Sequence, residues 1–289
     1  MTGLMDSAGC HQAGSSVDIS VVTPSFNQGQ FIEQTIRSVL GQEGVNLQYI
    51  VVDALSSDRT PEVLTRYEHL IDVLIAEKDS GQADALCKGF SHARGKFCCF
   101  VNSDDVLFPG ALARAVDYLK NNPGVDAVYS HRVFIDEHGR LLKFWILPGH
   151  SDYFMSRWDY IPQESCVWRT DTMISIGGID PSYHFAMDYD FFVRMMNRGT
   201  MVRLNTFLAA FRVHGRSKTS CLLSTTGLRE MNLVREKYGI RLTASDRLAS
   251  AMLYAGIESA SWFYQRVLAR GKPGFLELKL LQSSRSDQK

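Results

Sequence analysis

Short apolar runs alternate with segments of helical periodicity through the first half of this 289-residue chain. Between Asp18 and about Arg132, runs such as Ile19–Val22 and Tyr49–Val52 have the length and composition of buried strands. The segments between them place apolar residues three and four positions apart, as amphipathic helices do. This alternation predicts an α/β fold in which helices flank a mostly parallel, Rossmann-like sheet.

The same pattern predicts further strands at 73–76, 97–101 and 127–130, and helices that begin near Pro61, Gln82 and Pro109. Proline is favoured at the first position of a helix, which supports two of these helix starts. After the strand at 127–130, the sequence Glu137-His138-Gly139 predicts the turn of a β-hairpin.

The pattern loosens after this hairpin. Residues 147–216 are expected to form aromatic-rich loops with a short helix near 172–176 and a second helix over 188–197. Residues 222–289 are predicted to be a helical extension, and their eleven basic and six acidic residues give it a formal charge of +5.

Charge and cysteine usage narrow the function classes. Lys plus Arg and Asp plus Glu both total 31, so no overall positive field favours a nucleic-acid partner. The six cysteines show no disulfide or metal-site spacing, which is typical of a reduced, cytoplasmic protein. No signal peptide and no apolar run long enough to span a bilayer is evident, so a cytoplasmic or peripheral membrane protein is expected.

Two carboxylates follow the apolar run at 97–101 directly, in the sequence Asn102-Ser103-Asp104-Asp105. In open α/β sheets, ligands bind beyond the carboxyl ends of the strands. Carboxylates there are suitable ligands for Mg²⁺ or Mn²⁺ carrying a diphosphate. Taken alone, the pair is more simply explained as turn residues that precede the next helix.

Three further strand-to-helix turns carry candidate residues. The first, Thr23-Pro24-Ser25-Phe26-Asn27, lacks the glycine spacing of a dinucleotide site or a P-loop. The second begins at Asp53, whose carboxylate could accept a hydrogen bond from a uracil or thymine imide. The third holds Asp79, Gln82 and Asp84 at a predicted helix N-terminus, where backbone N–H groups favour anions. Helix capping is the simpler explanation for Asp53 and Asp79.

The second half contributes two candidates. Asp188 begins a predicted helix and could act as a general base, although acidic residues are favoured at helix starts in any case. Further on, Arg212 and His214 lie in a basic segment that could supply diphosphate contacts and a metal ligand, whereas a single histidine is usually structural.

The order and spacing of these features over residues 18–219 resemble the family 2 glycosyltransferases of the GT-A fold. The segments that carry the resemblance are Thr23–Asn27, Asp53, Asp79–Ala85, Asn102–Asp105, Gly177–Asp180, Met187–Asp190 and Arg212–His214. The resemblance implies that Asp53 reads the base, Asp104 contacts the ribose and the metal, and Asp105 ligates the metal. It also implies that Asp188 is the catalytic base.

By the same resemblance, residues 18–132 would bind the nucleotide sugar and 133–219 the acceptor. The flanking parts would be a disordered stretch at 1–17 and the helical extension at 220–289. The implied activity is inverting transfer from a UDP- or dTDP-sugar, with Mn²⁺ or Mg²⁺, to a glycan or lipid-linked acceptor in polysaccharide biosynthesis. The basic extension suggests peripheral docking on an anionic membrane.

Two departures from the family pattern bear on these roles. The glycine pair that commonly follows the base-reading aspartate is Ala54-Leu55 here, with Arg59 in place of a later glycine, so a differently shaped nucleoside loop is expected. The usual acidic neighbour of the catalytic base is Met187.

Two other functions are consistent with parts of the pattern. A non-catalytic module that binds nucleotides or glycans would keep the fold without the chemistry. A nucleotidyltransferase would need a basic, glycine-rich loop after the first strand, and Phe26-Asn27-Gln28-Gly29 lacks such cations.

Overall fold

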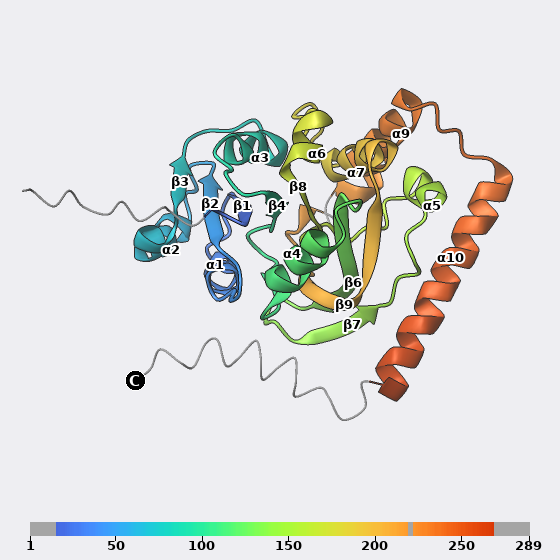
Figure 1. Cartoon of the computed structure of the whole chain (residues 1–289), viewed down its shortest axis with the longest axis horizontal. Helices are drawn as coiled ribbons and strands as arrows, with labels where there is room; N and C mark the ends of the chain where they lie inside the picture. The colour runs from blue at the N-terminus through green and yellow to red at the C-terminus, as the bar shows by residue number, and fades with distance from the viewer. Residues whose placement is uncertain (1–15, 219–221, 269–289) are drawn as a thin grey trace, which may run out of the picture.

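The first four strands form one parallel layer (Figure 1). In this computed structural model, which describes residues 16–218 and 222–268, they are β1 (Ile19–Ser25), β2 (Leu47–Asp53), β3 (Val73–Ala76) and β4 (Phe97–Phe100). They pair in the order β3-β2-β1-β4. The predicted parallel sheet is therefore confirmed for this half.

Helices follow these strands as the periodicity predicts. They are α1 (Ile32–Leu40), α2 (Thr60–Tyr67), the short η1 (Glu68–Leu70), α3 (Gln82–Ser91) and α4 (Ala111–Asn121). The expected start of α4 at Pro109 is wrong by two residues. Gly110 adopts a left-handed conformation with φ 70° at the N-cap, and the helix begins after it.

The second half extends the same sheet with a mixture of directions. Its strands are β5 (Val106–Leu107), β6 (Ala127–Ile135), β7 (Leu141–Trp145), β8 (Val167–Arg169) and β9 (Met201–Arg212). The order continues β4-β8-β6-β9-β5, and β7 pairs with β6 in the predicted hairpin. Only the β6–β9 pair is parallel among these.

Strand β9 corrects the expectation that residues 147–216 are mainly loops. Its burial does not alternate strictly, and its register against β6 shifts twice. The alternation of apolar and polar residues that marks a half-buried strand in a sequence is therefore missing. The helices expected nearby are present as α6 (Thr170–Ser175) and α7 (Met187–Arg198), together with α5 (Asp152–Arg157) and the short η2 (Gln163–Ser165).

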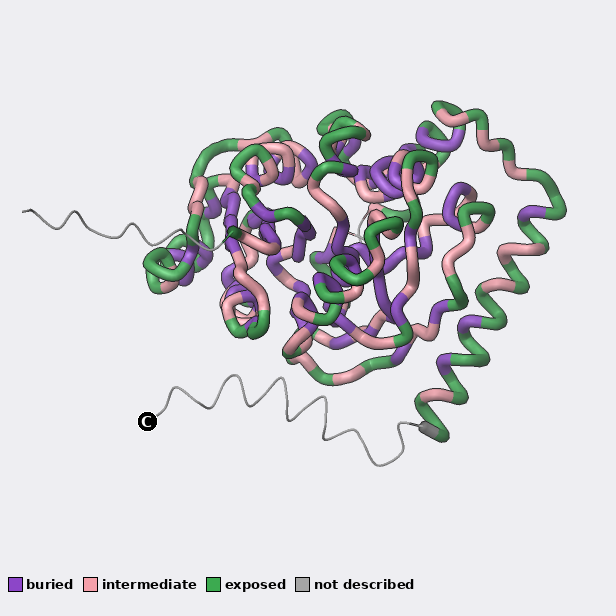
Figure 2. The backbone as a smooth tube through the Cα atoms, in the orientation of Figure 1, coloured by how far each residue is buried: buried purple, intermediate pink, exposed green. Residues whose placement is uncertain are grey.

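Two apolar cores lie on the two faces of the sheet. Val22 belongs to the core that includes α3 and α7, whereas its neighbour Val21 belongs to the core that includes α1 and α4. Neighbouring residues of a strand point to opposite faces, so β1 contributes to both cores. Strands β1, β2 and β4 are accordingly buried along almost their whole length (Figure 2).

The described part of the C-terminal extension is helical, as predicted. It consists of η3 (Leu223–Gly227), α9 (Leu228–Lys237), α10 (Ala244–Phe263) and η4 (Tyr264–Leu268). Helix α10 runs along one side of the molecule (Figure 1). Among the described residues, no helix combines the length and apolar character needed to cross a bilayer. The disorder expected at 1–17 falls almost wholly outside the described residues.

Candidate active site

A cavity of about 730 Å³ opens where β1 and β4 end and α3 begins. Crevices at the carboxyl ends of strands are the usual ligand sites of such sheets. Six of the sequence-predicted residues line it: Pro24, Ser25, Asp79, Gln82, Asn102 and Asp104. The turns at residues 23–27, 79–85 and 102–105 therefore meet in space, as expected from their positions after neighbouring strands.

Asp104, which lines this cavity, contacts His214. His214 Nε2 lies 3.0 Å from Asp104 Oδ2, although the residues are 110 positions apart. The imidazole is almost fully buried and packs on the ring of Phe31, with ring centroids 4.6 Å apart. Packing thus fixes the orientation of His214 relative to the carboxylate.

Asp105 lies behind this pair and is buried. Its Oδ1 accepts a hydrogen bond from the backbone N–H of Arg212 at 2.9 Å, and its Oδ2 accepts one from Asn102 Nδ2 at 3.3 Å. Burial, followed by the charge of Asp104, raises the pKa of Asp105 well above its ordinary value. Within residues 16–218 and 222–268, no group of three His, Cys, Asp or Glu side chains converges on one point.

The donors present nevertheless fit a Mg²⁺ or Mn²⁺ ion that also binds a diphosphate. Magnesium is usually held by one or two carboxylates together with substrate phosphates and water. Asp104 supplies a cavity-lining carboxylate and His214 an adjacent ring nitrogen. A complete cage of protein ligands is therefore unnecessary.

A chain of hydrogen-bonded polar side chains connects three residues of the cavity lining. Lys218 Nζ donates to Gln82 Oε1 at 2.9 Å, and Gln82 Nε2 donates to Asn102 Oδ1 at 2.6 Å. Asn102 in turn contacts Gln163 of η2, whose Nε2 is held by the carbonyl of Phe100 at 2.7 Å. Gln163 was not predicted as a site residue, because nothing in the local sequence around it marks a site.

The turn before α3 is organised by its own carboxylates. Asp79 Oδ1 accepts the N–H of Gly81, whose φ of 128° favours glycine, and Asp84 Oδ2 accepts the N–H of Ser80. Asp84 does not line the cavity and holds the turn, whereas Asp79 lines it. Burial raises the pKa of Asp79.

Three of the predicted residues, Thr23 in β1, Asp53 at the end of β2 and Asn27 in the loop after β1, do not line the cavity. The carboxylate of Asp53 accepts the N–H of Ser56 at 2.8 Å and its hydroxyl at 2.6 Å. Asn27 Oδ1 accepts the N–H of Ser57 at 2.9 Å, and the hydroxyl of Thr23 accepts that of Tyr49 at 3.1 Å.

Leu55, in this loop, has a φ of 56°, a conformation that favours glycine. It occupies the second position of the glycine pair that commonly follows the base-reading aspartate in family 2 glycosyltransferases. The loop therefore places an exposed leucine in a strained backbone conformation.

Arg212 is fully buried behind Asp104 and outside the cavity lining. Its Nε donates to the carbonyl of Asp104 at 2.7 Å, and its Nη1 donates to the carbonyl of Asp136 at 3.0 Å. Burial lowers its pKa. Arg212 thus ties the end of β9 to the Asp104 turn and to the β6–β7 hairpin.

Asp188 is the second residue of α7, and its Oδ1 accepts the N–H of Tyr189 at 2.9 Å. It does not line the cavity. Burial raises the pKa of its carboxyl group, while the charges of Lys218 and Arg132 act in the opposite direction. A carboxylate with a raised pKa is suited to general-base catalysis near neutral pH.

Glu230 of α9 holds the segment that leads into α7. Its carboxylate accepts the backbone N–H groups of His184, Phe185 and Ala186 at 3.1, 2.7 and 3.0 Å. The C-terminal extension therefore fixes the backbone just before Asp188. This contact was not predictable from local sequence, because Glu230 and the segment before α7 are more than forty residues apart.

A second missed group surrounds Asp188. Arg132 makes two hydrogen bonds of 2.8 and 2.9 Å to the buried carboxylate of Glu164. Among the described residues, the buried Oδ1 of Asp159 has no hydrogen-bond partner. Burial and then the charge of Asp188 raise the pKa of Asp159 well above its ordinary value.

Cationic side chains also line the cavity. Arg216 and Lys218 come from the basic segment noted in the sequence, and Arg229 comes from α9. His184 is a further lining residue. No sequence signal distinguishes Arg229 or His184 from surface residues, so neither was predicted.

Two solved structures illustrate the similarity of the fold. TarS from S. aureus in complex with UDP-GlcNAc superposes with a TM-score of 0.61 at 14% identity, over 92% of this chain and 81% of that one. A mannosyltransferase from Pyrobaculum calidifontis in complex with GDP-Man and Mn²⁺ gives 0.58 at 16% identity, over 94% and 87%. At these identities the likeness shows the fold, and the fold is GT-A.

Sequence comparison gives the family. The putative teichuronic acid biosynthesis glycosyltransferase TuaG of Bacillus subtilis is 36% identical over 104 residues, which are 35% of this chain and 41% of that protein. The match therefore spans less than half of this relative. The model of the family described as glycosyl transferase family 2 matches residues 20–169, about half of the chain. This chain belongs to glycosyl transferase family 2.

Proposed function

We propose that this protein is an inverting glycosyltransferase that moves a sugar from a nucleoside diphosphate sugar to a hydroxyl group of a glycan or lipid-linked acceptor. The observation that carries the proposal is the cavity at the strand ends, which Asp104 lines together with Arg216, Lys218 and Arg229 and where His214 contacts Asp104. Family membership and the sugar nucleotides named for the structural neighbours support a donor of this class. UDP and dTDP are the favoured nucleotides.

Asp104 and His214 would hold a divalent cation, with Asp105 as the third candidate ligand behind them. When bound, Mn²⁺ or Mg²⁺ would supply Lewis-acid stabilisation of negative charge on the leaving diphosphate. Lys218 and Arg216 would contribute positive charge in the same cavity. Asp53 would read the base from the loop at 53–57.

Asp188 would act as the general base. Its carboxylate takes the proton of the acceptor hydroxyl while the acceptor oxygen forms a bond to the anomeric carbon. The bond from that carbon to the diphosphate oxygen breaks in the same displacement, and the nucleoside diphosphate leaves. Attack from the opposite face inverts the anomeric centre.

The product class follows from the relatives. TuaG is named for teichuronic acid biosynthesis, and other relatives are named for O-antigen and succinoglycan biosynthesis. We therefore propose a role in polysaccharide biosynthesis, with the reaction taking place in the cytoplasm. A lipid-linked acceptor would bring the enzyme to the inner face of the membrane.

Two assays on the full-length protein test the proposal. The first measures the melting temperature with UDP, dTDP, GDP and CDP, each with and without Mn²⁺. A ligand at about 100 times its dissociation constant adds roughly 2.7 kcal/mol, a shift of several degrees. The second measures release of nucleoside diphosphate from UDP- and dTDP-sugars. Binding without turnover would favour the non-catalytic module, and release of pyrophosphate would favour a nucleotidyltransferase.

A further inference from the structure

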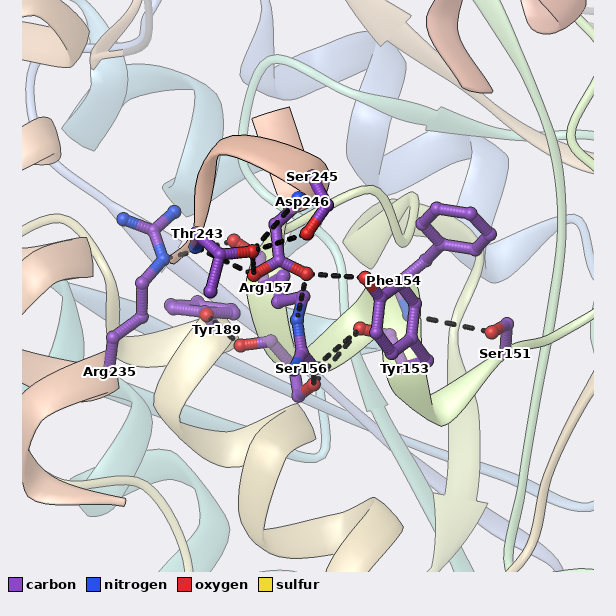
Figure 3. A network of polar contacts seen from close by, with 10 residues as sticks. All are labelled: Ser151, Tyr153, Phe154, Ser156, Arg157, Tyr189, Arg235, Thr243, Ser245 and Asp246. Atoms are coloured by element: carbon purple, nitrogen blue, oxygen red, sulfur yellow. Dashed lines mark hydrogen bonds and ion pairs between the residues drawn. The ribbon is translucent and has the colours of Figure 1, made fainter. Parts of the chain in front are cut away.

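Helix α10 is fixed to the body of the protein through one of its faces. At its start, Asp246 accepts hydrogen bonds from the hydroxyl of Tyr153, from Arg157 Nε at 2.9 Å and from Thr243 N at 2.7 Å (Figure 3). Near its end, Ser261 Oγ accepts the N–H of Ile146 at 2.9 Å. These contacts fix which face of α10 points away from the protein.

The opposite face carries an exposed apolar stripe. Successive residues of an α-helix are rotated by about 100°, so Leu248, Met252 and Trp262 lie roughly opposite the buried Asp246, Ile257 and Ser261. The side chains of these three residues and of Phe263 are each about half exposed or more. Small residues fill the positions between them, namely Ala251, Ala255 and Ser259.

Such a stripe is unusual on a helix that already buries one face. A surface helix normally presents polar residues on its outer side, and a helix that is apolar on both sides is normally covered on both. From Leu248 to Phe263 the stripe is about 22 Å long at 1.5 Å per residue. Contiguous exposed apolar patches of this kind typically mark interaction sites.

The charges beside the stripe indicate what covers it. Arg247 and Arg266 lie near its two ends, and the guanidinium of Arg266 lies 5.5 Å from the centre of the Trp262 ring. The acidic residues of α10 are used elsewhere, because Asp246 points inward and Glu258 pairs with Lys143 at 3.1 Å. In the sequence, residues 269–289 add five basic and two acidic residues.

These charges fit an anionic lipid surface better than a second copy of the chain. A two-fold pairing of α10 with itself, parallel or antiparallel, would bring arginines together without acidic partners on this face. Aromatic and aliphatic side chains flanked by arginines are instead typical of helices that lie in the interface of a bilayer.

We propose that the outward face of α10 docks the protein on an anionic membrane, with Leu248, Met252, Trp262 and Phe263 inserted between lipid headgroups and Arg247 and Arg266 in contact with them. The surface lies outside the cavity lining, so the inference depends on no step of the proposed reaction.

Flotation of the full-length protein with extruded vesicles tests this inference. Vesicles of 70% phosphatidylcholine and 30% phosphatidylglycerol should carry the protein, and pure phosphatidylcholine vesicles should carry much less. The double variant Met252→Asp/Trp262→Asp should lose binding, and Arg247→Gln/Arg266→Gln should weaken it roughly thirtyfold. A blue shift of tryptophan emission on binding should disappear in Trp262→Phe.

The matched control places the same two charges on exposed apolar residues elsewhere. Leu70→Asp/Ile174→Asp should bind vesicles like the unaltered protein, and both aspartate doubles should keep their release of nucleoside diphosphate. Equal loss of binding in the two doubles, or no binding of the unaltered protein, would overturn the proposal. So would a dimer in light scattering that only Met252→Asp/Trp262→Asp dissociates, because the stripe would then be a subunit interface.

Discussion

His214 Nε2 lies 3.0 Å from Asp104 Oδ2, which connects the end of β9 to the turn after β4. A buried imidazole that packs on Phe31 leaves the pair little freedom to move. The same two segments are joined by Arg212, which binds the carbonyl of Asp104 and the carboxylate of Asp105. The acidic turn is therefore preorganised by β9, the strand that the sequence pattern did not reveal.

Asp188→Asn should lower turnover by about 10²- to 10⁴-fold, because it removes a positioned general base. The carboxylate contacts only the N–H of the next residue among the hydrogen bonds of the described structure, so the melting temperature should change little. Steady-state kinetics and thermal unfolding of the same preparation measure both effects. Near-normal turnover would show that another group accepts the proton.

Asp190 on the same helix is the matched control for this substitution. It is fully buried and pairs with Arg194 at 2.7 Å and with Lys237 at 2.9 Å. Asp190→Asn should therefore destabilise the protein by about 2–4 kcal/mol, since it breaks a buried ion pair. Below its lowered melting temperature it should turn over far faster than Asp188→Asn.

The activity should fall in acid at a higher pH than an ordinary aspartate would cause. Burial raises the pKa of Asp188, so the folded enzyme holds the proton to a higher pH, and only the deprotonated form accepts one from the acceptor. The acidic limb of kcat/KM reports this pKa. Lys218→Met should move the limb to still higher pH, because the charge of Lys218 favours the carboxylate. An unchanged limb in Asp188→Asn would refute the assignment.

Leu55→Gly should stabilise the protein by about 0.5–1 kcal/mol. A left-handed conformation costs an L-residue about 1–2 kcal/mol, which exceeds the entropy cost of glycine, and the leucine side chain is half exposed. Ala54→Gly, at the neighbouring position without a positive φ, should destabilise by a similar amount. Urea unfolding measures both. Destabilisation by Leu55→Gly would mean that the side chain makes a needed contact.

The parallel half of the fold was predictable because each of its strands is a short apolar run followed by an amphipathic helix. Strand β3 (Val73–Ala76) matches its predicted limits. Strand β9 was not predictable, because both its faces are partly buried and its register shifts, so that polar residues such as Arg203 and Asn205 interrupt the apolar pattern.

The residues of the candidate site also fall into two groups, those that local sequence predicts and those that only tertiary packing brings to the site. Residues in the turns that follow strands, such as Asp104 and Gln82, were predictable since parallel strands end at one edge of the sheet. Residues such as Gln163, Arg229 and Glu230 reach the region through tertiary packing. No short-range pattern marks them, and the supporting positions of Arg212 and Asp84 likewise emerge only from their contacts.

Calorimetric titration of UDP with and without Mn²⁺ tests the central claim most directly, using the unaltered protein, Asp104→Asn and His214→Ala. Loss of a ligand or of the group that orients it typically costs about 10- to 100-fold in metal affinity. The account predicts that Mn²⁺ strengthens UDP binding to the unaltered protein at least tenfold. Both variants should lose this gain in affinity. The control variant His138→Ala, in the exposed hairpin turn, should retain it. Equal UDP affinity with and without Mn²⁺, or a full gain in Asp104→Asn, would contradict it.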